Sequence, residues 1–269
     1  ILGRWAAFVC HVPMILHTVH GPTFPERISP HKRWFYRTLE QWTGRITDHF
    51  VFVGEELRQE YIRFAVCGES NSATIRTGRP DHEIACLARM TQPEKQRIRE
   101  SLVPEGTEFF VVTVGRVVPS KQQEHAVRIL AELRKEKVNA CLAVVGEANL
   151  KEEMGYVEFL KSLSSDLQVS DYVRFVGHRE DVLDIMASAD AVLHTSKYEG
   201  LPNVLVEAAL CSRPIVSYRV SGAGEVIQDG KTGFIVAQGD IPEAISKLLL
   251  LARHPEAAHQ MGRAANEAV

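Results

Sequence analysis

Two acidic residues separated by seven positions, Glu199 and Glu207, mark the stretch of this chain with the clearest potential for chemistry. From Val204 to Cys211 every residue except Glu207 is apolar, which predicts a helix without a polar face. A carboxylate on such a helix is costly to bury unless it is paired or hydrogen-bonded. The preceding run, 191–194, predicts a parallel strand, and ligands of open α/β sheets bind beyond the carboxyl ends of strands. The stretch therefore favours the binding of a ligand rich in hydroxyl groups. The alternative is that one Glu caps a helix and the other is an ordinary surface residue.

A second group of candidate residues follows the apolar run Phe109–Val114. Ser120 and Gln123 have the spacing of a capping box, which predicts a helix that begins at Lys121. A cation in the first helical turn opposes the helix dipole, unless an anion is bound there. We therefore expect an anion between Arg116, Lys121 and the free N–H groups of this helix. The alternative is that both cations are ordinary solvated side chains.

Two further loops reach the same edge of the predicted sheet, Val176-Gly177-His178 and the segment Ser221–Glu225. The glycines at 222 and 224 do not complete the dinucleotide-binding motif, because Ile227 occupies its last position. Gly230-Lys231-Thr232 resembles the end of a P-loop, but the earlier glycine is missing. Neither nucleotide motif is therefore present, although the glycines would let backbone amides approach a ligand.

The histidines and acids do not favour a metal site. His17 and His20 lie three apart on or beside a strand, so they should point to opposite faces. We expect His17 in the core and His20, at the strand end before Gly21, in a site. The chain contains no D-x-D pair, the usual carboxylate seat for a divalent ion on a sugar nucleotide. We therefore expect no metal.

Composition narrows the class of protein. The 269 residues are 45% hydrophobic and 24% charged with a net charge of −3, which is typical of a globular protein and gives no basic field for nucleic acid. No apolar run approaches the roughly 20 residues of a membrane-spanning helix. The five cysteines are scattered without a C-x-x-C pair, which indicates free thiols in a reducing, cytoplasmic compartment.

One predicted helix, Pro30–Ile46, combines basic and aromatic residues. Its apolar stripe has helical spacing and consists of Phe35, Leu39, Trp42 and Ile46. Its cations are Lys32, Arg33, Arg37 and Arg45. We favour a solvated basic face behind a packed aromatic stripe, and the alternative is a helix that rests on an anionic membrane surface.

The remaining pattern predicts an α/β protein with parallel sheets. Residues 14–75 give β-α-β-α-β, and a polar helix at 93–102 leads to a second unit in which six apolar strands alternate with amphipathic helices. The expected strands of the second unit are Phe109–Val114, Cys141–Val145, Val173–Val176, Ala191–His194, Pro214–Tyr218 and Phe234–Val236. Because the chain starts with Ile inside an α/β pattern and ends inside a helical one, we expect a fragment of a longer protein.

These residues resemble a known family. Glu199 and Glu207 match the E-x7-E element of retaining GT-B glycosyltransferases. Three other segments fit the same family in the same order, namely His20-Gly21, Gly115-Arg116 with Lys121, and 221–234. The chain resembles glycosyltransferase family 4, the glycosyl transferases group 1, over nearly its whole length. The resemblance implies a GT-B fold of two Rossmann-like domains. These would be an incomplete acceptor-side domain at 1–88, a nucleotide-sugar donor domain at 89–253 and the start of a C-terminal helix at 254–269.

The resemblance also implies residue roles. Arg116 and Lys121 would clamp the donor diphosphate, Glu199 would hold sugar hydroxyls and Glu207 would bind the ribose. His20 would lie beside the reacting carbon, so the implied catalytic residues are His20, Arg116, Lys121 and Glu199. The other donor-binding residues implied are Gly115, Val176, Gly177, His178, Gly200, Leu201, Pro202, Asn203, Val204 and Leu205.

The implied reaction is hexosyl transfer with retention from a UDP- or GDP-sugar, without a metal or other cofactor, as in polysaccharide biosynthesis. The acceptor could be a glycan, a lipid-linked glycan or a small molecule. The first domain could also contact the inner face of the membrane peripherally. The chain departs from the family at Gln122, where glycine is frequent, and it lacks the glycine-rich loop near the family's N-terminus. The alternatives are a non-hydrolysing sugar-nucleotide epimerase of GT-B fold and a non-catalytic fragment that binds nucleotide sugars.

Overall fold

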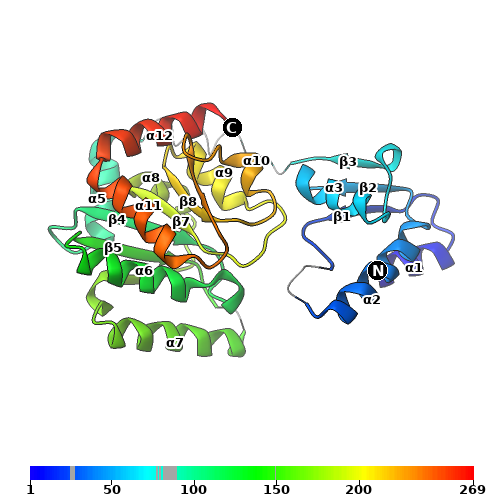
Figure 1. The fold of residues 1–269 in the computed structure, drawn as a ribbon, viewed down its shortest axis with the longest axis horizontal. Helices are drawn as coiled ribbons and strands as arrows, with labels where there is room; N and C mark the ends of the chain where they lie inside the picture. The colour runs from blue at the N-terminus through cyan, green and yellow to red at the C-terminus, as the bar shows by residue number, and fades with distance from the viewer. Residues whose placement is uncertain (25–27, 77, 79, 81–89, 149) are drawn as a thin grey trace. The chain divides into compact units, whose positions relative to one another are not determined.

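The computed structural model describes residues 1–24, 28–76, 78, 80, 90–148 and 150–269. Backbone contacts divide the chain into two compact units (Figure 1). The first consists of residues 1–78 together with 199–202, and the second of residues 79–198 and 203–269. The predicted domain boundary after residue 88 falls within 81–89, which lies outside the described residues.

The first unit is built on a three-stranded parallel sheet with the strand order β1-β2-β3. The strands and their connections are β1 (Leu16–Val19), α2 (Pro30–Gly44), β2 (His49–Phe52), α3 (Glu55–Arg63), the 3-10 turn η1 (Glu69–Asn71) and β3 (Ser72–Thr74). The predicted β-α-β-α-β order is therefore confirmed. The core of this unit is aromatic, and the side chains that are closed to solvent include Phe24, Phe50, Phe52 and Tyr61.

A short helix that we did not predict, α1 (Leu2–Val9), lies beside α2 (Figure 1). The Arg4 Nη2 atom donates to Glu40 Oε2 at 2.5 Å, and both side chains are buried. Trp5 Nε1 donates to Thr43 Oγ1 at 3.0 Å. Buried charges are tolerated when they are paired, so α1 allows α2 to turn polar residues inward.

This arrangement contradicts the prediction of a packed aromatic stripe on α2. The side chains of Phe35 and Trp42 are 55% and 59% exposed. Leu39 and Ile46 are only partly buried. The stripe faces outward because Glu40, on the opposite side of the helix, occupies the inward position.

The second unit contains a six-stranded sheet with the order β6-β5-β4-β7-β8-β9, and every neighbouring pair is parallel. Its strands are β4 (Phe109–Val114), β5 (Ala140–Val145), β6 (Val173–Gly177), β7 (Ala191–His194), β8 (Ile215–Tyr218) and β9 (Gly233–Val236). All six predicted strands are confirmed. The chain winds outward in one direction from β4 to β6 and in the other from β7 to β9. The sheet therefore has its topological switch point between β4 and β7.

Helices cover both faces of this sheet (Figure 1). The helical segments are α5 (Gln92–Leu102), η2 (Pro119–Lys121), α6 (Gln123–Lys135), α7 (Lys151–Asp166), η3 (Ser170–Tyr172), α8 (Val182–Ser188), α9 (Asn203–Leu210), α10 (Ala223–Val226), α11 (Ile241–Arg253) and α12 (Pro255–Glu267). Alternate residues of β4 serve the two faces, as expected for a strand. Val111 packs into the core that contains α6 and α11, and Phe110 into the core that contains Ile185 of α8.

Two findings concern membrane-spanning helices and cysteines. Among the described helices, none is long and apolar enough to cross a membrane. The four cysteines in the described ranges are free thiols, namely Cys10, Cys67, Cys141 and Cys211. Cys86 lies outside those ranges.

Candidate functional site

The carboxyl ends of β4 and β7 meet at the switch point of the second unit. The two strands pair directly, with Val111 opposite Ala191 and Val112 opposite Val192. The loop that contains Arg116 and Lys121 follows β4, and the segment that leads to α9 follows β7. Ligands of doubly wound sheets bind in the crevice at such a point, so both predicted groups of this unit lie where a ligand is expected.

Hydrogen bonds join these two loops directly. The Thr195 hydroxyl donates to the carbonyl oxygen of Lys121 at 2.8 Å, and the Lys197 amide donates to the carbonyl oxygen of Ser120 at 2.9 Å. Thr195 is 1% exposed, so the contact is shielded from water. The β4 loop and the β7 loop therefore form one structural element, although they are more than seventy residues apart in the sequence.

The helix after the β4 loop does not begin where the capping box predicts. Residues 119–121 form the 3-10 turn η2, Gln122 is left-handed with φ of 51°, and α6 begins at Gln123. The Gln123 side chain donates from Nε2 to the carbonyl oxygen of Arg116 at 2.9 Å, so it does not bond back to Ser120. Lys121 consequently lies before the helix, and the argument from a cation in the first helical turn is wrong. The residue still lies at the carboxyl edge of the sheet.

The Lys121 side chain lies against Gly115. Its φ is +144°, and a Cβ atom at this position would lie 3.5 Å from Lys121 Cε. The Lys121 side chain therefore runs back over the first residue after β4. This contact brings the stem of Lys121 next to the loop that carries Arg116.

The Arg116 guanidinium is 64% exposed and only loosely held. Its Nη1 atom is 3.6 Å from Oε1 of Glu153, whose side chain is 11% exposed. An exposed ion pair of this length contributes little to stability, so the guanidinium is available to another anion. Glu153 also accepts a bond from the Leu150 amide at the start of α7.

Sequence reasoning missed Gly146, the first residue after β5. A Cβ atom here would lie 2.0 Å from the carbonyl oxygen of Gly115, and the φ of Gly146 is +136°. The Gly146 amide donates to the carbonyl oxygen of Gly177 at 2.8 Å. Glycine is therefore required for the β4, β5 and β6 loops to lie close together. The signal that could have found it is a glycine directly after an apolar strand.

The other predicted donor-binding residues of this unit lie at the same edge. Val176 and Gly177 end β6, and the exposed His178 follows them. Asn203, Val204 and Leu205 form the first turn of α9 directly after the β7 loop.

Glu207 is 6% exposed on α9, a helix whose other residues after Asn203 are apolar. The predicted buried acid is therefore confirmed. A buried carboxylate of this kind is a strong candidate for ligand recognition because its burial is costly.

The remaining predicted residues belong to the first unit. A Cβ atom on Gly200 would lie 2.2 Å from the carbonyl oxygen of His20, so the 199–202 loop packs directly on the backbone after β1. Leu201 and Pro202 are buried, whereas the His20 side chain is exposed. His20 and Glu199 thus belong to one group of loops.

His17 is half-buried, so the prediction that it lies in the core is confirmed only in part. Its ring meets Phe50 edge to face, with the centroids 5.9 Å apart. Burial, and then the positive charge of Arg4, lowers the pKa of His17 to about 4. The imidazole is therefore neutral at ordinary pH.

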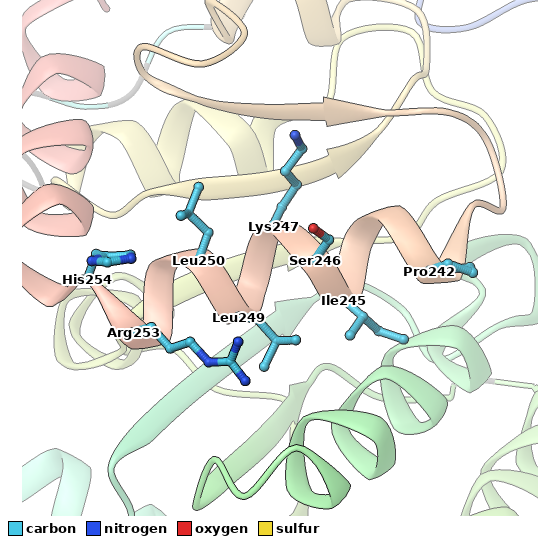
Figure 2. Close-up of a pocket in the computed structure, with 8 residues that line it drawn as sticks. All are labelled: Pro242, Ile245, Ser246, Lys247, Leu249, Leu250, Arg253 and His254. Carbon is cyan, nitrogen blue, oxygen red and sulfur yellow. The ribbon is translucent and has the colours of Figure 1, made fainter.

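The described residues also bear on a metal site and on a second pocket. Within the described ranges, no group of three or more His, Cys, Asp or Glu residues is placed to hold a metal ion. A shallow pocket lies along α11 (Figure 2), and its lining residues all fall between Pro242 and His254. None of the candidate site residues lines this pocket.

Comparisons with known proteins show the family to which the chain belongs. The family model described as glycosyl transferases group 1 matches residues 94–268, well over half of the chain. A putative glycosyltransferase EpsD of Bacillus subtilis (strain 168) is 26% identical over 98% of this chain and 67% of its own length. The Escherichia coli UDP-Gal:alpha-D-GlcNAc-diphosphoundecaprenol alpha-1,3-galactosyltransferase is 23% identical over 93% of this chain. The chain spans 62% of that enzyme's length.

Solved structures show the fold. Anabaena HepE, crystallised with UDP-glucose, superposes with a TM-score of 0.82 over 99% of this chain and 70% of its own, at 23% identity. Sucrose-phosphate synthase of Thermosynechococcus elongatus gives a TM-score of 0.82 at 19% identity, over 99% of this chain and 66% of its own. The fold is thus α/β of GT-B type with Rossmann-like parallel sheets, as predicted. The chain belongs to the glycosyl transferases group 1 family.

Proposed function

We propose that this chain is the larger part of a family 4 glycosyltransferase that transfers a hexose from a UDP- or GDP-sugar with retention of configuration. The main support for the proposal is the pair of hydrogen bonds between the β4 loop and the β7 loop at the switch point. Thr195 and Lys197 donate them to the backbone carbonyl oxygens of Lys121 and Ser120. Arg116, Lys121 and the start of α9 all follow strands that end at the same edge of the sheet. Anionic ligands are favoured by all of these groups.

In the proposed donor complex, Arg116 and Lys121 bind the two phosphates. The ammonium and guanidinium can each donate charge-assisted hydrogen bonds, which are roughly twice as strong as neutral ones. Amides at the start of α9 add donors next to the helix dipole. We assign Glu207 to the ribose hydroxyls, since a buried carboxylate accepts such bonds without competition from water.

The proposed reaction breaks the bond between the anomeric carbon and the phosphate oxygen and forms a bond from that carbon to an acceptor hydroxyl oxygen on the same face. The hydroxyl proton passes to the departing phosphate oxygen, so a nucleoside diphosphate leaves. Negative charge grows on that diphosphate in the transition state, and Arg116 and Lys121 stabilise it there. The chemistry assigned to these residues requires no metal ion.

We assign His20 and Glu199 of the first unit to the donor sugar, Glu199 as an acceptor for sugar hydroxyls and His20 beside the reacting carbon. The first unit is also the proposed acceptor side. The Escherichia coli relative's name specifies a diphosphoundecaprenol acceptor, which supports a lipid-linked glycan as the first acceptor to test. Action at the cytoplasmic face of a membrane belongs to the same proposal.

The experiment is a thermal-shift screen of the full-length protein with UDP-, GDP- and ADP-sugars, followed by product analysis with and without acceptors. We expect one UDP- or GDP-sugar to raise the melting temperature. We expect product with the anomeric configuration of the donor only when an acceptor is present. A changed nucleotide sugar without acceptor would identify an epimerase, and binding without any product would identify a non-catalytic binding protein.

A further inference from the structure

A buried acid pairs with the arginine that is proposed to bind the donor diphosphate. The side chain of Glu153 is 11% exposed and that of Arg116 is 64% exposed, and Glu153 Oε1 lies 3.6 Å from Arg116 Nη1. In the proposed function the same guanidinium binds phosphate oxygens. Glu153 and the ligand are therefore two anions that compete for one cation.

Glu153 is held in place at the start of α7. Its Oε2 atom accepts a hydrogen bond from the Leu150 amide at 3.2 Å. About one turn further along the helix, the buried Tyr156 donates from its hydroxyl to a carboxylate oxygen of Glu124, in the first turn of α6. These contacts anchor the start of α7 to the start of α6, so the Glu153 carboxylate is fixed beside the β4 loop.

The backbone on both sides of Arg116 is also fixed. The amides of Gly115 and Val117 donate to the carbonyl oxygens of Val145 and Glu147, each at 3.0 Å. Arg116 can therefore change its partner only by moving its long and exposed side chain. A shift of the guanidinium from Glu153 to a bound diphosphate requires no change in the loop.

The capping of α7 does not by itself require a charge at position 153. A glutamine could accept the same bond from the Leu150 amide, and an amide is less costly to bury than a carboxylate. The helix dipole favours an acid in the first turn only modestly. The negative charge of Glu153 is thus best explained by its effect on Arg116.

The donor and the product of the proposed reaction differ in charge. Each phosphate of a nucleotide sugar carries about one negative charge, whereas a terminal phosphate carries about −1.5 to −2 near pH 7. The departing nucleoside diphosphate is therefore the more negative ligand. A fixed negative charge beside the phosphate site repels it more strongly than it repels the nucleotide sugar.

We propose that Glu153 is a positioning residue that acts through Arg116 to weaken the binding of the nucleoside diphosphate product and so speeds its release. Product release limits the turnover of many enzymes, so a site that binds its product less tightly gains rate. The inference rests on the proposed binding of the donor diphosphate by Arg116. It adds that the site discriminates against its own product.

The test compares the wild-type full-length protein with Glu153→Gln. Calorimetric titration measures the affinity for UDP and GDP, and for the UDP- or GDP-sugar that stabilises the wild type. We expect the variant to bind the nucleoside diphosphate about threefold to fivefold more tightly, the upper range for an exposed ion pair. The nucleotide sugar should gain about twofold or less. The inhibition constant of the nucleoside diphosphate in the transfer assay should fall by the same factor as its dissociation constant.

Two further variants and one control complete the design. In the background of Arg116→Ala, Glu153→Gln should no longer tighten binding, because the cation through which the acid acts is gone. Glu153→Asp keeps the charge but withdraws it from Arg116, so it should tighten binding by a smaller factor and serves as the test if Glu153→Gln is unstable. The matched control is Glu158→Gln, which changes an exposed acid of α7 that pairs with Lys161 and should alter neither affinity.

The outcomes separate this inference from the proposed function. Unchanged affinity in Arg116→Ala alone would remove the diphosphate assignment and the inference with it. A loss of affinity in Arg116→Ala, together with unchanged or weaker product binding in both Glu153 variants, would overturn the inference and leave the proposed function intact. Equal tightening of nucleoside diphosphate and nucleotide sugar would also overturn it, because the acid would then not discriminate between them.

Discussion

Replacement of Lys121 by alanine tests the donor site most directly. The carbonyl oxygen of Lys121 accepts the Thr195 hydroxyl at 2.8 Å. The substitution keeps that bond. The side chain itself lies over Gly115 and ends in a charge, so its removal takes away a cation without opening a buried core.

The size of the effect follows from the charge. A hydrogen bond to a charged group contributes about 1.5–3 kcal/mol, so loss of the ammonium should weaken nucleoside diphosphate binding by roughly tenfold to a hundredfold. The melting temperature should change by only a few degrees, since the substitution leaves the backbone bond to Thr195 in place and opens no core cavity. The salt dependence of binding should also fall, because one fewer cation contacts the phosphates.

The assay is calorimetric titration of UDP and GDP into the Lys121→Ala variant, with thermal melts of the free protein. Lys161→Ala is the matched control, because this lysine is exposed on α7 and pairs only with Glu158 among the described residues. Unchanged affinity for both nucleotides in Lys121→Ala would refute the diphosphate assignment. A large loss of stability would instead assign the side chain a structural role.

Substitutions at three further sites, two of them with a matched control on α7, test other parts of the structure. Gly146→Ala should lower the melting temperature by roughly 5 °C or more and weaken nucleotide binding, because its Cβ would lie 2.0 Å from a carbonyl oxygen and the φ is strained. Gly155→Ala, with open space on α7, should instead stabilise by about 0.5–1 kcal/mol. Glu207→Gln should weaken nucleotide binding by about tenfold while the protein stays folded, and Glu158→Gln should change neither, as titration calorimetry and thermal melts would show. The pKa of His17 is about 4 in the folded protein and 6.5 in the unfolded chain. As the pH falls from about 6.5 to 4, the unfolded chain takes up the proton first, so the free energy of unfolding decreases. Urea unfolding at several pH values should show that slope in the wild type and a smaller one in His17→Gln.

The sheet of the second unit was predictable because its strands are buried on both faces. Runs such as Phe109–Val114 are continuously apolar, and each is followed by an amphipathic helix. Burial of α9 was predictable for the same reason, since its sequence has no polar face. The position of Glu207 followed from that helix and from the acid spacing.

The start of α6 was not predictable from local rules. A capping box requires Gln123 to bond back to residue 120, but its side chain donates to the carbonyl oxygen of Arg116. The backbone of Ser120 and Lys121 binds the β7 loop, which is distant in the sequence. Tertiary contacts thus override the local capping preference, and Gln122 takes a left-handed conformation where the family often has glycine.

The orientation of α2 was not predictable for a different reason. A helical stripe shows that one face is apolar, but it does not show which face is covered. Here Arg4 and Trp5 of α1 bind Glu40 and Thr43, so the polar side of α2 lies inward. We did not predict α1 itself, which spans Leu2–Val9.

The family model matches residues 94–268, and the first unit, apart from the 199–202 loop, lies outside that range. The joined loops after β4 and β7, the close approach at Gly146 and the buried Glu207 all belong to the second unit, and they lie within the range that the family model matches. In the proposed function the first unit is the acceptor side, so we expect acceptor selection to depend largely on residues that the family model does not include.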